Sequence, residues 1–261
     1  MKTFRYACSA ALLLAATVIA QAEELRVLSV GSAEIAIKTL IPEFNKDGTR
    51  PVKFQWGPPN KVWDRIKAGE TFDVFILSEP AMQELQALSG IKDESRVGLA
   101  RTGLGVVVPA SMPSPDISTT ENFKKSVLSA KAILYRDPSL PNMSGEMVER
   151  VLRKIDVLDQ VKPRMTVSPR PEAEVLVAAG KSDFSFVNIS EVPTSPAIHY
   201  AGPLPKDLQI YTNLETALAA KGSQSQAAKD FIALISGDKA KSAWEKAGFE
   251  MAYTYQKART N

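Results

Sequence analysis

The sequence contains a single cysteine, Cys8, and a single histidine, His199. One cysteine cannot form a disulfide within the chain, and Cys8 lies in the N-terminal segment that is expected to be removed, so we expect no thiolate chemistry in the mature protein. A Ser-His-Asp triad needs a histidine that carries protons, and His199 lies in the proline-rich stretch SPAIHYAGPLP, where a lone histidine is more often a surface or packing residue. The sequence also lacks a G-x-S-x-G elbow, an H-E-x-x-H pair and a Cys/His cluster. We therefore expect neither a catalytic triad nor a metal centre.

Long apolar runs are scarce as well. One extends from Ala10 to Ala20 in MKTFRYACSAALLLAATVIAQA, after Lys2 and Arg5 and before an Ala-x-Ala site. A charged start, a short apolar run and a small-residue site are the parts of a secretory signal peptide, and the run is too short for a permanent bilayer helix. The sequence therefore predicts that residues 1–22 are removed before Glu23 and that the protein is exported to the periplasm.

An excess of charge of one sign is also missing. The chain has 32 Lys and Arg against 29 Asp and Glu, which gives a net charge of +3. No basic stripe stands out, so nucleic acid is not an expected partner. The length after the signal peptide suits two compact lobes or one large domain.

The sequence does contain an alternation of short apolar segments with amphipathic ones. Continuous apolar runs such as FDVFIL (72–77) are typical of buried parallel strands. Alternating strands and helices predict an α/β fold, with mainly parallel sheet flanked by helices. Strands are expected at 24–30, 51–56, 72–77, 102–109, 130–138, 164–168, 182–191 and 208–220, and two C-terminal helices on either side of Ser236–Gly237.

Three expected helix starts that follow a strand carry a serine: Ser32, Ser78 and Ser144. The first backbone NH groups of a helix lack partners within it, and the helix dipole adds a partial positive charge there. In open α/β sheets, ligands bind beyond the carboxyl ends of the strands. Three converging helix starts would therefore build an anion pocket, whereas ordinary N-capping explains each serine separately.

The order of these segments resembles that of the periplasmic molybdate-binding proteins of ABC importers, which are type II periplasmic binding proteins. The resemblance implies two α/β lobes around a hinge that the chain crosses near Gly105 and near Thr212. It also implies a cleft that closes on a small anion, a membrane permease as partner, and a monomer with neither a cofactor nor an enzymatic activity. The stretches that carry the resemblance are LRVLSVGSAEIAIKTLIPEF, DRIKAGETFDVFILSEPAMQEL, GLGVVVP, YRDPSLPNMSGEMVERVL, VLVAAGKSDFSFVNISE and AAKDFIALISGDKAKSAWEKAGF. The implied lobes are residues 23–105 with 213–261, and residues 106–212.

Three of the family's ligand positions have a counterpart here. Ser32 matches a serine at the first strand–helix junction, and Ser78 matches a small residue after the third strand. Ser144, followed by Gly145, stands where the family has an alanine at a helix start. The resemblance therefore implies that these residues hold an anion through OH and NH donors.

Three other positions depart from the family. A second ligand serine is replaced by Pro58, Pro59 and Asn60, and proline has neither a hydroxyl nor an NH group. An apolar residue before a helix corresponds to Arg170, and a tyrosine corresponds to Asn188. We include Asn60, Arg170 and Asn188 among the expected ligand-binding residues.

These departures leave the ligand open between two classes. The resemblance implies molybdate or tungstate, whereas the lost neutral donors and the gained guanidinium suit a small organic di- or tricarboxylate. Two other functions stay open. An exported carboxylate-dependent hydrolase would need converging acids, for which Glu34, Glu79 and Glu191 are candidates. A ligand sensor would present its closed form to a receptor instead of a permease.

Overall fold

The computed structural model describes residues 24–57, 59–139, 144–167, 176–222 and 225–251. Within these residues one nine-stranded sheet has the order β2-β1-β3-β9-β4-β7-β5-β6, and β8 pairs with β4. The strands are β1 (Leu25–Val30), β2 (Val52–Gly57), β3 (Val74–Ser78), β4 (Val97–Pro109), β5 (Ile133–Tyr135), β6 (Met165–Val167), β7 (Phe184–Asn188), β8 (Ile198–Pro203) and β9 (Tyr211–Leu218).

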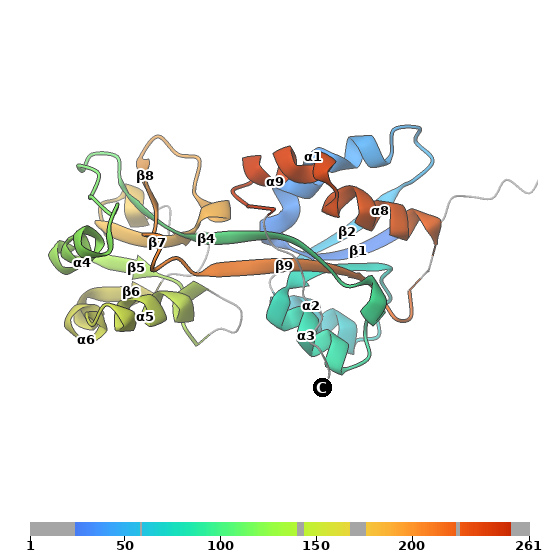
Figure 1. Ribbon diagram of the computed structural model, residues 1–261, viewed down its shortest axis with the longest axis horizontal. Helices are drawn as coiled ribbons and strands as arrows, with labels where there is room; N and C mark the ends of the chain where they lie inside the picture. The colour runs from blue at the N-terminus through green and yellow to red at the C-terminus, as the bar shows by residue number, and fades with distance from the viewer. Residues whose placement is uncertain (1–23, 58, 140–143, 168–175, 223–224, 252–261) are drawn as a thin grey trace, which may run out of the picture.

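Helices cover both faces of the sheet. In Figure 1, α1, α8 and α9 lie on one side of β1 and β9, and α2 and α3 lie on the other. The helices are α1 (Glu34–Phe44), α2 (Pro59–Lys67), α3 (Glu79–Ala87), α4 (Thr120–Ser129), α5 (Ser144–Lys154), α6 (Leu158–Val161), α8 (Gln226–Ser236) and α9 (Lys241–Lys246). Short 3-10 helices are η1 (Gly31–Ala33), η2 (Asp93–Ser95), η3 (Lys162–Arg164), η4 (Ile189–Glu191) and η5 (Asp238–Ala240).

The apolar core of the described residues divides into two main clusters. The first cluster joins β1 and β3 to α1, α3, α8 and α9, and includes Phe231 and Trp244. The second cluster joins β5 and β7 to α4 and α5, and includes Phe123 and Phe184. Each helix buries a stripe of apolar residues against its own cluster, as an amphipathic sequence requires. Figure 1 shows the two groups of elements at opposite ends of the molecule, with β4 and β9 running between them.

Strands within each cluster pair in parallel, whereas the pairs that involve the connecting strands β4 and β9 are antiparallel. The pairs β1–β2, β1–β3, β5–β6 and β5–β7 are parallel. The pairs β3–β9, β4–β9, β4–β7 and β4–β8 are antiparallel. The expected parallel sheet therefore occurs within each cluster, and every antiparallel pair among the described strands involves β4 or β9.

Strand β4 changes partner in the middle of its length. It pairs with β9 as far as Gly103 and with β7 from Leu104 onward. This change lies next to Gly105, where the resemblance places the first crossing between lobes. The division into two lobes at that point stays a prediction.

In the part of the chain that the structure describes, no helix combines the length and the apolar character needed to cross a membrane.

Candidate functional site

The carboxyl ends of the parallel strands in the two clusters point toward each other. β3 is antiparallel to β9, and β9 is antiparallel to β4, so β3 runs in the direction of β4, toward the second cluster. β7 is antiparallel to β4 and runs toward the first cluster. β1 and β2 end beside β3, and β5 ends beside β7. We call the residues at and just after these strand ends the facing strand ends.

The strand registers indicate how far apart the two sides lie. Ser78 pairs with Leu214, and Leu214 pairs with Ala100. On the other side, Asn188 pairs with Leu104. The levels of Ser78 and Asn188 therefore differ by four residues of β4, or about 13 Å along the strand. This separation suits a small molecule held by side chains from both sides.

Ser78 ends β3 and is the N-cap residue of α3 by its backbone. Its side chain makes no capping hydrogen bond, although capping was one explanation of this serine. The residue is only 5% exposed, and its Oγ is buried without a hydrogen-bond partner. Buried polar groups nearly always have a partner, so this hydroxyl, which has none among the described residues, is a candidate for contact with a bound group.

Ser32 lies in η1, between β1 and α1, and is half-buried. The N-cap of α1 is Ala33, and neither η1 nor α1 has a side-chain capping bond. The capping explanation is therefore wrong for Ser32. The role of Ser32 as a ligand donor stays a prediction.

The first turn of α5 packs against the segment that follows β5. Ser144 and Gly145 begin the helix, and both are buried. A Cβ atom on Gly145 would lie 2.2 Å from the carbonyl oxygen of Arg136 and 2.7 Å from the backbone nitrogen of Pro138. The missing side chain thus allows α5 to begin beside Arg136. Ligand binding by Ser144 and Gly145 stays a prediction.

Arg136 was not among the predicted site residues, yet it lies at the facing strand ends. It directly follows β5, and its Nη2 lies 3.6 Å from Oε2 of Glu191, which ends η4. Their side chains are only 11% and 16% exposed. The position of an arginine directly after a buried strand, in the stretch YRDP, was the signal that could have identified it.

Asn188 ends β7 at the same edge and is half-buried. It is the N-cap of η4 but makes no side-chain capping bond, and its Oδ1 is buried without a hydrogen-bond partner. The Oγ of Ser190 is likewise buried without a hydrogen-bond partner among the described residues. Two more polar atoms near the facing strand ends therefore have no hydrogen-bond partner in the part of the chain that the structure describes.

The structure does not place the side chains of two predicted ligand residues, Arg170 and Asn60. Arg170 lies outside the described residues, as does Pro58. Asn60 lies in the first turn of α2, where the structure describes the backbone alone. These positions stay predictions.

Side chains on β4 and β9 connect the two clusters. Oγ1 of Thr102 donates a hydrogen bond to the carbonyl oxygen of Gly248 (3.1 Å) and accepts one from the backbone NH of Ser190 (3.0 Å). Oγ1 of Thr212 donates to Sδ of Met147 in the first turns of α5 (3.5 Å). These contacts hold η4 and α5 close to the strands that join the clusters.

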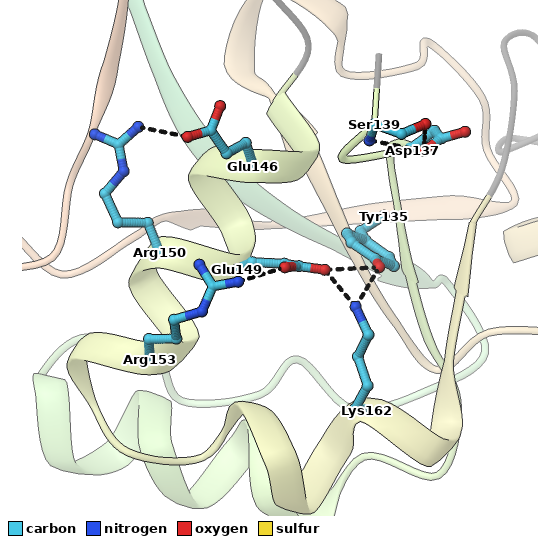
Figure 2. A network of polar contacts seen from close by, with 8 residues as sticks. All are labelled: Tyr135, Asp137, Ser139, Glu146, Glu149, Arg150, Arg153 and Lys162. Atoms are coloured by element: carbon cyan, nitrogen blue, oxygen red, sulfur yellow. Dashed lines mark hydrogen bonds and ion pairs between the residues drawn. The ribbon is translucent and has the colours of Figure 1, made fainter. Parts of the chain in front are cut away.

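Figure 2 shows a polar network that ties α5 to β5 and η3. Glu149, 8% exposed, accepts hydrogen bonds from the Tyr135 hydroxyl (3.1 Å), from Nη2 of Arg153 (2.8 Å) and from Nζ of Lys162. Nζ of Lys162 also donates to the Tyr135 hydroxyl (3.1 Å). The hydrogen bond from Lys162 lowers the pKa of the Glu149 carboxyl, and the same bond raises the pKa of Lys162. The network fixes α5, the helix that begins at Ser144.

The three acids considered for a hydrolase interact with other side chains and do not form a pair among the described residues. Their contacts are Glu34 with Lys38 (2.6 Å), Glu79 with Asn213 (2.8 Å) and Glu191 with Arg136 (3.6 Å). No group of three or more His, Asp or Glu side chains in this part of the chain could hold a metal ion.

Residues 25–250 match the model of a family described as bacterial extracellular solute-binding proteins. The match spans most of the chain, so the protein belongs to this family.

Comparisons with individual proteins add a relative and a fold. The chain is 27% identical over 251 residues to aconitate isomerase from a Pseudomonas species. The aligned region covers 92% of this chain and 94% of that protein. A substrate-binding domain assigned to a molybdenum ABC transporter from Clostridium difficile has a TM-score of 0.74 and 18% identity, covering 87% of this chain and 98% of that chain. The periplasmic molybdate-binding protein of Azotobacter vinelandii has a TM-score of 0.67 and 20% identity, with the same coverage. The predicted type II periplasmic binding protein fold is confirmed.

Proposed function

We propose that this protein captures a small anion between the facing strand ends and delivers it to the permease of an ABC-type importer. The observation that carries the proposal is the buried Ser78 hydroxyl, which has no hydrogen-bond partner among the described residues and lies where the parallel strands of both clusters converge. Ser144 at the start of α5 adds a helix N-terminus, next to the ion pair of Arg136 with Glu191. Residues 1–22 would direct the protein to the periplasm, where it would act as a monomer.

Within this proposal, a small organic di- or tricarboxylate fits better than molybdate or tungstate. A guanidinium binds a carboxylate through two parallel hydrogen bonds, and the predicted Arg170 offers one. Pro58 and Pro59 remove donors that a metal oxyanion would use. The relative named aconitate isomerase acts on a tricarboxylate, which supports the same class of ligand here.

A thermal-shift screen of residues 23–261 tests the proposal. The panel contains molybdate, tungstate, sulfate, phosphate, succinate, malate, citrate and aconitate. A ligand that binds only the folded state raises Tm, by about 5 °C or more at a hundred times its Kd. We expect a carboxylate to give this shift. A shift with molybdate and tungstate alone would assign the family's ligand instead, and no shift with any anion would overturn anion binding.

Serine variants test the position of the site. Ser32→Ala, Ser78→Ala and Ser144→Ala each remove a donor and should weaken binding of the panel ligand about five- to tenfold. Ser129→Ala is the matched control, because this exposed serine ends α4 and its hydroxyl donates to the carbonyl oxygen of Ser126 within the same helix. Normal binding by all three site variants would place the ligand elsewhere.

A second candidate function is isomerisation of an unsaturated tricarboxylate, favoured by the 27% identical relative. Such a reaction needs a group that accepts a proton from the substrate. Glu79 and Glu191 are the carboxylates at the facing strand ends, and Asn213 and Arg136 hold them in place. Proton NMR of cis-aconitate incubated with the protein distinguishes the functions: an importer protein leaves it unchanged, whereas an isomerase converts it to the trans isomer and loses activity in Glu79→Gln or Glu191→Gln.

A further inference from the structure

A pocket lies where the chain that pairs with β4 leaves the sheet. Pro203 at the end of β8 pairs with Gly105 of β4, and Tyr211 at the start of β9 pairs with Gly103. Residues 204–210 therefore loop out where β4 advances by only two residues. The pocket at this loop has a volume of about 510 Å³, which suits a small molecule. We call it the β8–β9 pocket.

The β8–β9 pocket is largely separate from the facing strand ends. Its walls are the loop before α4, the end of β8 with the chain that follows it, and the side chain of Glu250. It meets the facing strand ends at Ile189 of η4. Among the described residues, neither Ser78 nor Ser144 lines it. A ligand in this pocket would therefore occupy a second site.

Hydrogen bonds hold two walls of the pocket in place without a ligand. The backbone NH of Leu204 donates to the carbonyl oxygen of Leu104 (3.1 Å), which fixes the start of the loop against β4. On the opposite wall, the hydroxyl of Ser126 in α4 donates to the carbonyl oxygen of Asp116 (2.8 Å). Walls that are already fixed spare a ligand the entropic cost of ordering them.

Most of the lining is apolar. The ring of Tyr211 forms part of it, and the guanidinium carbon of Arg101 lies 3.9 Å from the centre of this ring. Small-molecule sites typically combine an apolar lining with a few polar groups. The lining therefore suits a ligand with an apolar side chain. Other apolar members of the lining are Pro115, Ile117, Ala201, Pro203, Leu204 and Pro205.

Charges of both signs lie around this apolar lining. Glu250 is neutralised within the chain, because Nε (3.0 Å) and Nη2 (2.9 Å) of Arg101 contact its Oε2. Asp116 accepts hydrogen bonds from the NH (2.9 Å) and the hydroxyl (2.7 Å) of Ser118, which lower the pKa of its carboxyl. No cation among the described residues pairs with Asp116, and no anion among them pairs with the exposed Lys206. One negative and one positive charge thus remain for a ligand.

We propose that the β8–β9 pocket binds a small zwitterion with an apolar side chain, namely an aliphatic amino acid, with its carboxylate facing Lys206 and its ammonium group facing Asp116. A dianion, the class proposed for the facing strand ends, would be repelled by Asp116, and an apolar cation would be repelled by Lys206. The two sites therefore take different ligands, and this proposal does not depend on the proposed function.

Leucine and three analogues test the proposal, because each analogue lacks one of the features that the pocket recognises. Isocaproate lacks the ammonium group, isoamylamine lacks the carboxylate, and glycine lacks the apolar side chain. Amide NMR of residues 23–261 during titration reports both affinity and position. We expect leucine to shift the signals of residues 115–118 and 201–206. Each analogue should bind at least about threefold more weakly, the modest effect that exposed ion pairs have.

Charge variants show whether the two side chains cause this preference. Asp116→Asn should bring the affinities of leucine and isocaproate close together, because the partner of the ammonium group is lost. Lys206→Gln should do the same for leucine and isoamylamine. Asp47→Asn is the matched control for the first variant, since Asp47 accepts from the NH (3.1 Å) and the hydroxyl (2.7 Å) of Thr49 in the same kind of turn. Lys181→Gln, at an exposed lysine outside the lining, is the control for the second.

Several results would overturn the zwitterion site. These are shifts located outside the pocket, no shift at the highest soluble concentration of leucine, equal binding of leucine and its analogues, or ratios that survive in Asp116→Asn and Lys206→Gln. Anion binding would still stand in each case, because Ser78→Ala tests it at a residue outside this pocket. Melting temperatures of the unliganded variants show that each one folds.

Discussion

Gly145 lies where two backbone segments come nearly into contact. A Cβ atom there would meet the carbonyl oxygen of Arg136 at 2.2 Å, a separation that requires the backbone to move. Inserting a methyl group into such a place destabilises a protein by about 2 kcal/mol. We expect Gly145→Ala to lower Tm by about 4–8 °C and to weaken ligand binding, because α5 and Ser144 must shift together. Thermal unfolding with and without the panel ligand measures both effects.

The same substitution at Gly31 is the control for this prediction. Gly31 lies before Ser32 on the other side of the site, and a Cβ there would meet nothing within 4 Å. Gly31→Ala should therefore change the stability by no more than about 0.5 kcal/mol. Equal losses in the two variants would show that glycine matters for chain flexibility rather than for the close approach of α5 to Arg136.

Single residues of the site were predictable where they follow a strand, and not where they depend on distant contacts. Ser78 was identified from its place in the sequence, because a strand end in an α/β fold is a favoured ligand position, and Asn188 from its match to a tyrosine of the molybdate-binding proteins. Their burial without a partner was not predictable, since it depends on how both clusters pack around them. Arg136 was missed because its proximity to Glu191 joins residues far apart in the sequence.

The polar network around Glu149 holds helix α5 in place, so loss of the Glu149 charge should destabilise the fold. The hydrogen bond from Lys162 is the main cause that lowers the Glu149 carboxyl pKa from its usual value of 4.5; burial opposes it, and the Tyr135 hydroxyl lowers the pKa further. A lowered folded-state pKa contributes stability above the unfolded pKa, which is lost as the pH falls through the folded pKa. Glu149→Gln should therefore lower the free energy of unfolding at pH 7 by about 1–3 kcal/mol.

The pH dependence separates this charge effect from a packing effect. The difference between the native protein and Glu149→Gln should shrink as urea unfolding is measured from pH 7 down to pH 3. On the same helix, Glu146→Gln is the control, because Glu146 pairs with Arg150 at the exposed surface and should contribute at most about 0.5 kcal/mol. A difference that stays constant down to pH 3 would contradict the charge effect.

The raised pKa of Lys162 determines the upper end of the pH range over which the same network stabilises the fold. Its main cause is the hydrogen bond to Glu149, followed by the one to Tyr135. A raised folded-state pKa contributes stability below the unfolded value of 10.5, and this stability is lost as the pH rises through the folded pKa. At neutral pH both partners are therefore charged, and α5 is fully held.

Among the elements, the buried strands were predicted best. FDVFIL predicted a strand at 72–77 and the structure has Val74–Ser78, because a continuous apolar run has few other uses. β8 was missed, since IHYAGP includes a glycine and a proline and its side chains are mostly half-exposed; its pairing with β4 stabilises it. α4 was missed as well, because Phe123 and Val127 are its sole buried residues.

Strand β4 was predicted at 102–109, whereas it begins at Val97 in the structure. The missed part is stabilised by contacts with residues distant in the sequence. Its first part contains Arg101, which forms an ion pair with Glu250 (2.9 Å) and lies over the ring of Tyr211. At the change of partner, the side chain of Gln209 bonds to both the NH (2.8 Å) and the carbonyl oxygen (2.9 Å) of Leu104. A side chain thus takes the place of a neighbouring strand, which no local pattern in the sequence reveals.

At the level of the whole molecule, the two clusters and the strands between them predict a motion. The facing strand ends belong to different clusters, so a ligand that touches both sides stabilises the arrangement in which they are closest. We expect the clusters to approach each other when the panel ligand binds. Spin labels at Lys38→Cys on α1 and Lys125→Cys on α4 report the distance between the clusters, since both lysines are exposed.

The scarcity of cysteine makes this measurement specific. Cys8 lies in the predicted signal peptide, so residues 23–261 carry no thiol other than the two introduced ones. The control pair is Lys38→Cys with Lys241→Cys on α9, because α1 and α9 pack in the same cluster. Pulsed electron paramagnetic resonance should show a shorter distance for the first pair with ligand and no change for the second. A ligand that raises Tm yet changes neither distance would show that the anion binds without closing the molecule, which would contradict delivery of a closed form to the permease.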